Sequence, residues 1–195
     1  GQRQEKSESS RETRQRNGAI VVVQNGAGDA STIPFTAEEL ARIRRGESNL
    51  FSQENINDIE RIEAESFRGV ARQPTEEILR TLSNTRGIQM LFKEGETLKG
   101  YLSSLPASEA IIPVRNESFD DSDTTLYIES IAGDIDPFQT LRELKGNAKK
   151  AGYTKLAVHG VNERLNRALA RAGFELKEVV HDWLGTTAAY MELDL

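Results

Sequence analysis

The sequence contains no cysteine and only two histidines. Without cysteine there are no disulfides and no thiolate chemistry. A zinc site would have to be carried mainly by Asp or Glu, so we expect no metal site. The fold must therefore rest on a hydrophobic core, and 195 residues are enough to bury one without covalent cross-links.

Long apolar runs are also missing. None approaches the roughly 18 residues that a membrane-spanning helix needs, and residues 1–17 contain no apolar side chain at all. The chain carries 31 Asp+Glu against 25 Lys+Arg, a net charge of -6, which argues against a general nucleic-acid binder. These features predict a cytoplasmic protein that binds neither membrane nor nucleic acid.

The composition divides the chain into three regions. Residues 1–34 are mostly polar and cannot repay the entropy of ordering, so we expect a flexible tail or linker with a possible short strand at 19–23. Residues 35–48 are expected to form a short helical extension, opened by a capping box at Thr36. Residues 49–195 are expected to form the main domain.

Within the main domain the hydrophobic period changes from helical to strand-like and back. Two helices come first, one starting from a cap at Asn55 or Asn57 and one from Pro74. The elements that follow are strands 88–92, 97–104 and 124–132, a helix from 137, strand 155–159, a helix from 163, and strands 174–180 and 187–195. This order predicts a mixed α/β fold with one parallel strand pair joined by a helix.

Three segments near the C-terminus form a recognisable pattern. Residues 151–159 read as a helix end and a strand, and residues 162–175 look like an N-x-x-(A)-x-x-L-Y…G-F-E segment. Residues 190–195 read as a closing strand. Together they resemble the GCN5-related N-acetyltransferase (GNAT) superfamily, and residues 62–67 resemble the first helix of its peptide N-terminal acetyltransferase branch. The resemblance covers about 50–195 and implies a mostly antiparallel sheet, splayed at strands 4 and 5 and flanked by helices.

The resemblance also implies a cofactor and a reaction. GNAT proteins hold acetyl-CoA in the splay and transfer its acetyl group to an amine, here of a peptide, a protein or a small molecule. The pyrophosphate rests on N–H groups at the start of the next helix, where donors and the helix dipole attract an anion. By position, the cofactor would contact Ile131, Gly133, Gln139, Thr140 and Asn162. Asn162 is equally explained as a helix N-cap.

Two residues are candidates for catalysis. Glu129 lies where relatives often place a carboxylate and would take the proton of the attacking amine, directly or through water; its alternative is a strand residue facing solvent. His159 lies near the splay and has an ordinary pKa near neutrality; its alternative is a packed histidine. Trp183 and Tyr190 would line the acceptor pocket, or else belong to the core.

The sequence departs from the family pattern at the pyrophosphate loop. No Q/R-x-x-G-x-G/A motif occurs after the fourth strand. Instead, Pro137 removes one N–H donor, Asp136 reads as a helix cap, and Asp134 adds a second negative charge. Leu169 stands at the position of the family's general-acid tyrosine. These departures favour a second hypothesis, an inactive GNAT-fold domain that has lost CoA binding and serves as a protein-interaction or regulatory module of a larger protein.

A run of acids spans residues 116–136, which hold seven Asp and Glu and no Lys or Arg. Such a run would attract a cationic acceptor. Its alternative is a solvated loop.

Overall fold

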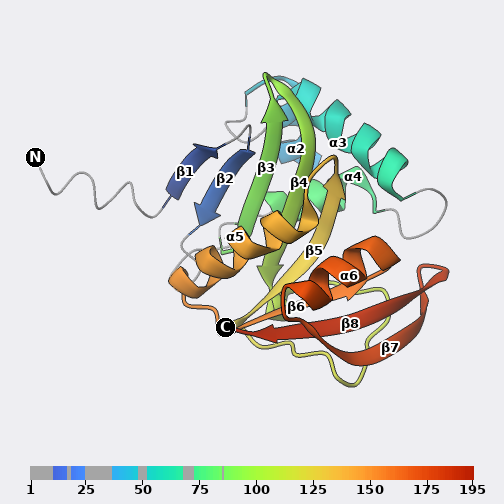
Figure 1. The fold of residues 1–195 in the computed structure, drawn as a ribbon. Helices are drawn as coiled ribbons and strands as arrows, with labels where there is room; N and C mark the ends of the chain where they lie inside the picture. Colours follow the sequence, from blue (N-terminus) through green and yellow to red (C-terminus); the bar gives the residue numbers. More distant parts are fainter. Residues whose placement is uncertain (1–10, 17–18, 25–36, 48–51, 68–72, 85) are drawn as a thin grey trace, which may run out of the picture.

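The computed structural model describes residues 11–16, 19–24, 37–47, 52–67, 73–84 and 86–195 (Figure 1). The strands are β1 Arg11–Arg16, β2 Ala19–Gln24, β3 Ile88–Glu94, β4 Thr97–Pro106, β5 Thr125–Gly133, β6 Lys155–Gly160, β7 Glu175–Trp183 and β8 Thr186–Asp194. The helices are α2 Ala37–Arg44, α3 Gln53–Ser66, α4 Thr75–Leu82, α5 Pro137–Lys150 and α6 Glu163–Arg171. The strands form one sheet in the order β1-β2-β3-β4-β5-β6-β8-β7, and only the β5–β6 pair is parallel. The predicted mixed α/β fold is confirmed.

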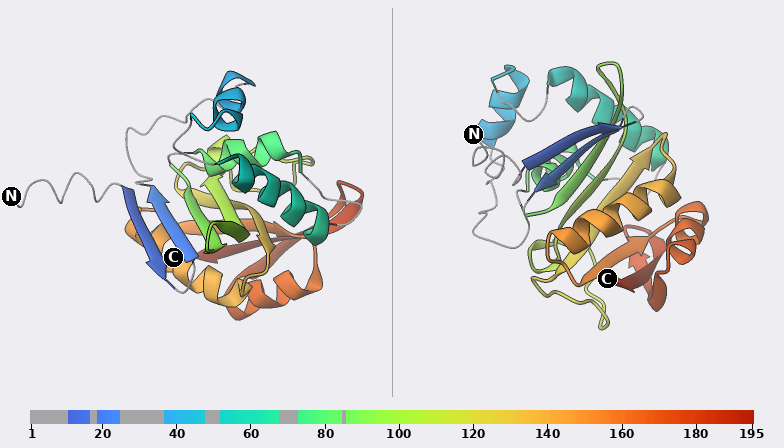
Figure 2. Two further views of the ribbon diagram at one scale, coloured as in Figure 1. Left: turned by 90° about the horizontal axis from the view of Figure 1, so that it is seen from above. Right: turned by 60° about the vertical axis from the view of Figure 1, so that its left-hand side comes forward.

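The helices cover both faces of the sheet, with α3 and α4 on one side and α5 and α6 on the other (Figure 2). Alternation along β5 builds the two cores, because Leu126 and Ile128 pack toward α5 and α6 while Tyr127 faces the opposite side. The side of Tyr127 is covered in two parts. One part lies under α3 and α4, and the other lies under the irregular segment 110–124, from which Val114 and Phe119 pack inward.

Most helix boundaries follow the expected caps, with one exception. Asp136 caps α5 and Gly173, in the left-handed region at φ 105, follows α6 as expected. The prediction that Asn55 or Asn57 caps the first long helix is wrong, because the Ser52 hydroxyl accepts from the Asn55 N–H at 3.1 Å. Asn55 is buried inside α3. Serine and asparagine cap equally well, so residue type alone did not separate the two positions.

Two strands are described in the N-terminal region. Residues 11–16 form β1, and the possible strand at 19–23 is present as β2, which pairs antiparallel with β3. Strand pairing uses backbone groups, so a polar sequence such as that of β1 can extend a sheet. The Thr36 cap lies outside the described residues. The division of the chain at residues 34 and 48 stays a prediction.

The sheet opens between β5 and β6. These strands pair from Thr125 opposite Lys155 to Ile128 opposite Val158, and there the pairing stops although β5 continues to Gly133. On the other side of β5, the register with β4 shifts at the same height, which leaves Glu129 as an extra residue. Such a bulge bends its strand. The fourth and fifth strands of the family fold correspond to β5 and β6 here, so the predicted splay is confirmed.

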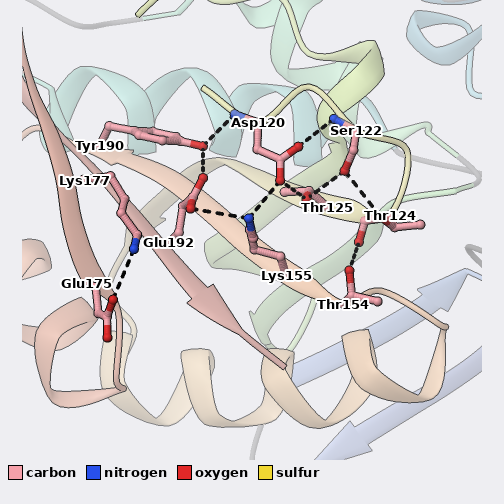
Figure 3. Close-up of polar contacts among 10 residues, drawn as sticks. All are labelled: Asp120, Ser122, Thr124, Thr125, Thr154, Lys155, Glu175, Lys177, Tyr190 and Glu192. Atoms are coloured by element: carbon pink, nitrogen blue, oxygen red, sulfur yellow. Dashed lines mark hydrogen bonds and ion pairs between the residues drawn. The ribbon is translucent and has the colours of Figure 1, made fainter. Parts of the chain in front are cut away.

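A polar network holds segment 110–124 against the sheet (Figure 3). The Lys155 ammonium lies 3.0 Å from Asp120 Oδ2 and 3.5 Å from Glu192 Oε1. The Tyr190 hydroxyl donates to Glu192 at 2.6 Å and accepts from the Asp120 N–H at 3.0 Å. Burial raises the pKa of Asp120, but hydrogen bonds from Lys155, Ser122 and Thr125 outweigh it and lower this pKa to about 2.

Replacing the central carboxylate tests how much this network contributes. The folded state depresses the pKa of Asp120 below its ordinary 3.8, so its contribution is present above pH 4 and is lost as the pH falls toward 2. Asp120→Asn should lower the free energy of unfolding by about 1–2 kcal/mol at pH 7 and by much less near pH 2.5. Urea denaturation at both pH values measures this. Asp121→Asn, which breaks an exposed pair with Arg115, should cost little, and an equal effect of both substitutions would contradict the account.

Candidate functional site

The opening between β5 and β6 contains a hollow of about 50 Å³, which we call the central hollow. This volume holds one or two water molecules. Its polar and aromatic wall comprises Glu63, Gln73, Tyr127, Glu129, Ser130, His159 and Trp183, and its apolar wall includes Ile111, Pro113, Val161 and Leu184. The structure thus brings together Glu129, His159 and Trp183, three of the residues that the sequence singled out.

The bulge decides where the carboxylate of Glu129 points. In a regular strand Glu129 and Ser130 would face opposite sides, but the extra residue lets both face α3 and α4. Glu129 Oε2 accepts a hydrogen bond from the Thr81 hydroxyl of α4 at 2.6 Å, and the Ser130 hydroxyl donates to Glu63 Oε1 of α3 at 3.4 Å. Glu129 is therefore half-buried and hydrogen-bonded to α4, and its carboxylate does not simply face solvent.

This environment changes the acidity of Glu129. Burial disfavours the charged form, and the nearby acids Glu77 and Glu63 act in the same direction. The hydrogen bond from Thr81 opposes them, and the net effect raises the pKa of Glu129 to about 7. The carboxyl therefore exchanges its proton in the neutral range, as a general base must.

Glu63 is a second carboxylate in the central hollow that sequence reasoning missed. It is 1% exposed, and its Oε1 accepts a hydrogen bond from the Tyr101 hydroxyl. The signal was present, because Glu63 lies one helical turn after Ile59 and two turns after Ile56 on the buried stripe of α3. A charged residue at an apolar position of a helix indicates a buried polar contact.

His159 is a packed residue with both ring nitrogens engaged. Nε2 lies 2.8 Å from Asn116 Oδ1, which only accepts, so Nε2 carries the proton and Nδ1 accepts from the Tyr127 hydroxyl at 2.7 Å. The ring stacks on Trp183 with centroids 3.9 Å apart. Burial lowers the pKa of His159 to about 4, so the ring is neutral at pH 7.

The two aromatic residues predicted to line the acceptor pocket have different positions. Trp183 lines the central hollow and is 7% exposed. Tyr190 is fully buried, and its hydroxyl is engaged by Glu192 and Asp120. Tyr190 is not among the residues that line the hollow, and it belongs to the core, as its alternative stated.

The start of α5, where the resemblance places the pyrophosphate, is closed by the chain itself. Asp136 Oδ1 accepts from the N–H groups of Phe138 at 3.0 Å and Gln139 at 3.3 Å. The Thr140 hydroxyl and N–H both donate to the Asp136 carbonyl. Pro137 has no N–H to offer. The backbone N–H groups of Gln139 and Thr140 are therefore already hydrogen-bonded to Asp136.

The backbone N–H groups of the loop before α5 are also hydrogen-bonded within the protein. The Gly133 N–H donates to the Ser66 hydroxyl at 3.2 Å, and the Asp134 N–H donates to the Lys99 carbonyl at 3.0 Å. Gly133 has φ 98, and a Cβ there would lie 2.3 Å from the Lys99 oxygen. This glycine is explained by the close approach of β4, without reference to a ligand.

Beside this closed helix start lie two larger depressions. One, of about 180 Å³, is lined by Ile131, Gly133 and Asn162; the Asn162 side chain also caps α6 by accepting from the Leu165 N–H at 2.7 Å. The other, of about 580 Å³, we call the α6 groove. It is lined by Asp134, Ile135, Asp136, Pro137, Phe138, Arg164, Arg167, Ala168 and Arg171.

The arginines of the α6 groove were missed by sequence reasoning, although their spacing of three and four places them on one helix face. The Arg171 guanidinium lies 4.6 Å from the centre of the Phe138 ring. Arg167 lies 3.9 Å from Glu163, and both side chains are exposed. Three cations thus face the two acids of the loop, so the groove is not the purely negative surface that Asp134 and Asp136 alone predicted.

The acidic run at 116–136 does not form one surface. Asp121 pairs with Arg115 at 2.7 Å and Asp123 with Arg86 at 2.6 Å, while Asp120 holds Lys155. In the part of the chain that the structure describes, no cluster of three potential metal ligands occurs. Nor does any helix in that part have the length and apolar character needed to cross a membrane.

Comparison with known proteins identifies the architecture. No family model and no curated protein matches the sequence. Solved structures do match. An N-acetyltransferase from Staphylococcus aureus Mu50 is 18% identical, with a TM-score of 0.53 over 75% of this chain and 96% of that one. The loading GNATL domain of CurA from Lyngbya majuscula is 12% identical, with a TM-score of 0.54 over 71% and 92%.

A third match, the aminoglycoside 6'-N-acetyltransferase from Enterococcus faecium, is 9% identical, with a TM-score of 0.51 over 74% of this chain and 94% of that one. The chain has the GNAT fold. At these identities the likeness establishes the fold, and the activity has to be argued from the site.

The two perturbed groups of the central hollow predict opposite pH effects on stability. The folded pKa of Glu129 lies above its ordinary 4.5, so stability is lost as the pH rises from 4.5 to 7. The folded pKa of His159 lies below its ordinary 6.5, so stability is lost as the pH falls from 6.5 to 4. We expect the two slopes to offset each other in the unmodified protein.

Glu129→Gln should remove the contribution of Glu129, so that only the rise of stability with pH that His159 produces remains. Relative to the unmodified protein, its free energy of unfolding should rise by about 2–3 kcal/mol between pH 4.5 and pH 8. Denaturant titrations across this range measure the difference, with Glu76→Gln on the exposed side of α4 as the control. Parallel stability curves for Glu129→Gln and the unmodified protein would show that Glu129 titrates normally.

Proposed function

We propose that the protein is an acetyl-CoA-dependent N-acetyltransferase that acts on a primary amine. One observation carries the proposal: a carboxylate whose pKa is raised to about 7 lies in the opening between β5 and β6 of a GNAT fold. A base at this pKa removes a proton at neutral pH and releases it again. The names of the S. aureus and E. faecium matches, both N-acetyltransferases, support the same reaction class.

The residues present fit acetyl-CoA if its phosphates lie on α6 rather than at the start of α5. Arg164, Arg167 and Arg171 supply planar, permanently charged donors suited to phosphate. Ile131 and Asn162 line the adjoining depression that leads toward the opening of the sheet. When bound, the cofactor supplies an acetyl thioester, which is the electrophile for the amine.

The side chains of the central hollow then have separate tasks. Glu129 accepts the proton of the amine, and the hydrogen bond from Thr81 fixes the orientation of its carboxylate. His159, neutral and held between Asn116 and Tyr127, orients the Tyr127 hydroxyl on the wall of the hollow. Glu129, at about 7, is a far stronger base than His159, at about 4, which favours Glu129 for the proton transfer. Leu169 is buried and supplies no acid.

A second candidate function is favoured by the closed start of α5. If the capped N–H groups of Phe138 and Gln139 reflect loss of the cofactor, the domain is an inactive GNAT-fold module that binds a protein partner. The two candidates differ in one property, since only the first requires acetyl-CoA binding.

Catalysis by Glu129 can be tested with an assay for the thiol of released CoA, because the protein has no thiol of its own to give a background signal. Free CoA released from acetyl-CoA in the presence of primary amines is measured with a thiol reagent. Glu129→Gln should lower kcat/KM by roughly 10²–10⁴-fold, while Glu76→Gln should leave it unchanged. In the unmodified protein kcat/KM should rise with pH in two separate limbs. One, near pH 7, comes from Glu129, and the other, near pH 10, comes from deprotonation of the alkylamine substrate.

Glu129→Gln should lack the limb near 7, because the base that produces it is gone. An unchanged rate in this variant would remove Glu129 from the mechanism.

A further inference from the structure

The mouth of the central hollow is apolar and unusually exposed. Among the described residues, the large hydrophobic side chains with high exposure are Ile111 at 75%, Leu176 at 56%, Val179 at 48% and Leu184 at 41%. Ile111 and Leu184 both line the hollow, whereas Leu176 and Val179 lie on the edge strand β7. The mouth therefore offers a ligand apolar surface that water currently covers.

The backbone at this mouth adopts a costly conformation. Leu184 lies in the turn between β7 and β8, and Asp182 lies in β7 where its register with β8 shifts. Both Leu184, at φ 48, and Asp182, at φ 60, are in the left-handed region. This conformation costs about 1–2 kcal/mol for an L-residue other than glycine. Trp183, between them, is placed against His159 and the hollow. Leu184 and Gly185, at φ 48 and 81, are the two central residues of this hairpin, and positive φ at both positions is favoured in such a turn, which projects Leu184 at the mouth.

The polar wall of the hollow has the opposite character, because it presents hydrogen-bond acceptors. Gln73 Oε1 is buried and has no hydrogen-bond partner. The Glu129 carboxylate lies in the same wall and receives a hydrogen bond from Thr81. Leaving a buried acceptor such as the Gln73 oxygen unmatched is costly, so the site favours a ligand that brings N–H donors.

We propose that the acceptor is a primary amine at the end of an unbranched apolar stem, and this inference rests on the proposed function. The nitrogen donates to Gln73 Oε1 and to Glu129, and the stem lies against Ile111, Trp183 and Leu184. The hollow itself, of about 50 Å³, has room for the amino group, so the stem lies along the apolar mouth.

A polyamine is disfavoured by the same geometry, because its second charge would lie against the apolar mouth. On the far side of Glu129 a smaller hollow of about 30 Å³ contains Glu77 and Glu109. Arg80 lines it as well, and Glu109 pairs with Arg86 at 3.2 Å, so it offers no concentrated negative charge to a second ammonium group.

Trp183 is the single tryptophan of the chain, so its fluorescence reports binding to the hollow without any turnover. We would titrate the protein, without acetyl-CoA, with the linear alkylamines from propylamine to heptylamine. The dissociation constant should tighten about three- to fourfold with each methylene. A diaminoalkane of equal length should bind at least tenfold more weakly, and the matching alcohol more weakly still.

Variants separate the two halves of the site. Gln73→Leu should weaken the binding of all amines about tenfold and keep the gain in affinity per methylene. Ile111→Ser should reduce that gain. Val179→Ser, an exposed residue of β7 outside the hollow, is the matched control and should change neither. A blocked peptide with a central lysine presents the same stem. Comparing it with pentylamine decides whether a protein side chain or a free alkylamine fits better, and either result supports the proposal.

Two results would overturn the inference: affinity that does not depend on stem length, or tighter binding of diamines. These results are distinct from failure of the proposed function. Stem-dependent binding without acetyl transfer would refute the enzyme and keep this ligand, whereas acetyl transfer to polyamines without stem selection would keep the enzyme and refute this ligand.

Discussion

The extra residue in β5 controls the geometry of the whole site. Because Glu129 is inserted opposite the Ser103–Ser104 step of β4, β5 leaves β6 after Ile128 and the sheet opens. The same insertion turns Glu129 and Ser130 toward one side, where α3 and α4 supply their partners. One register shift therefore creates the hollow, places a carboxylate in it and buries that carboxylate enough to move its pKa into the neutral range.

The start of α5 shows how stability and ligand binding compete for the same groups. The Asp136 cap satisfies the N–H donors of Phe138 and Gln139, which stabilises the helix and occupies the groups that would otherwise bind an anion. Positive charge instead lies on α6, where Arg164, Arg167 and Arg171 line one groove. In this arrangement phosphates would be recognised by side chains and not by a backbone loop, so a glycine motif would not be needed.

The sequence predicts the order of elements because hydrophobic period, caps and breakers are local properties. Asp136, Asn162 and Gly173 set helix boundaries as expected. The bulge at Glu129 could not be predicted in the same way, because it depends on the register with β4. The sequence does not separate Trp183 from Tyr190 either. Tertiary packing places both in one buried cluster, and only Trp183 also lines the hollow.

The central claim is that this fold still binds acetyl-CoA, with its phosphates on α6. Calorimetric titration with acetyl-CoA tests it directly. A micromolar dissociation constant, about -8 kcal/mol, is predicted for the unmodified protein, together with a loss of tenfold or more when Arg164 and Arg167 are both changed to Ala and little change for Gln139→Ala. No heat and no thermal shift at millimolar acetyl-CoA would contradict the account and favour the inactive binding module.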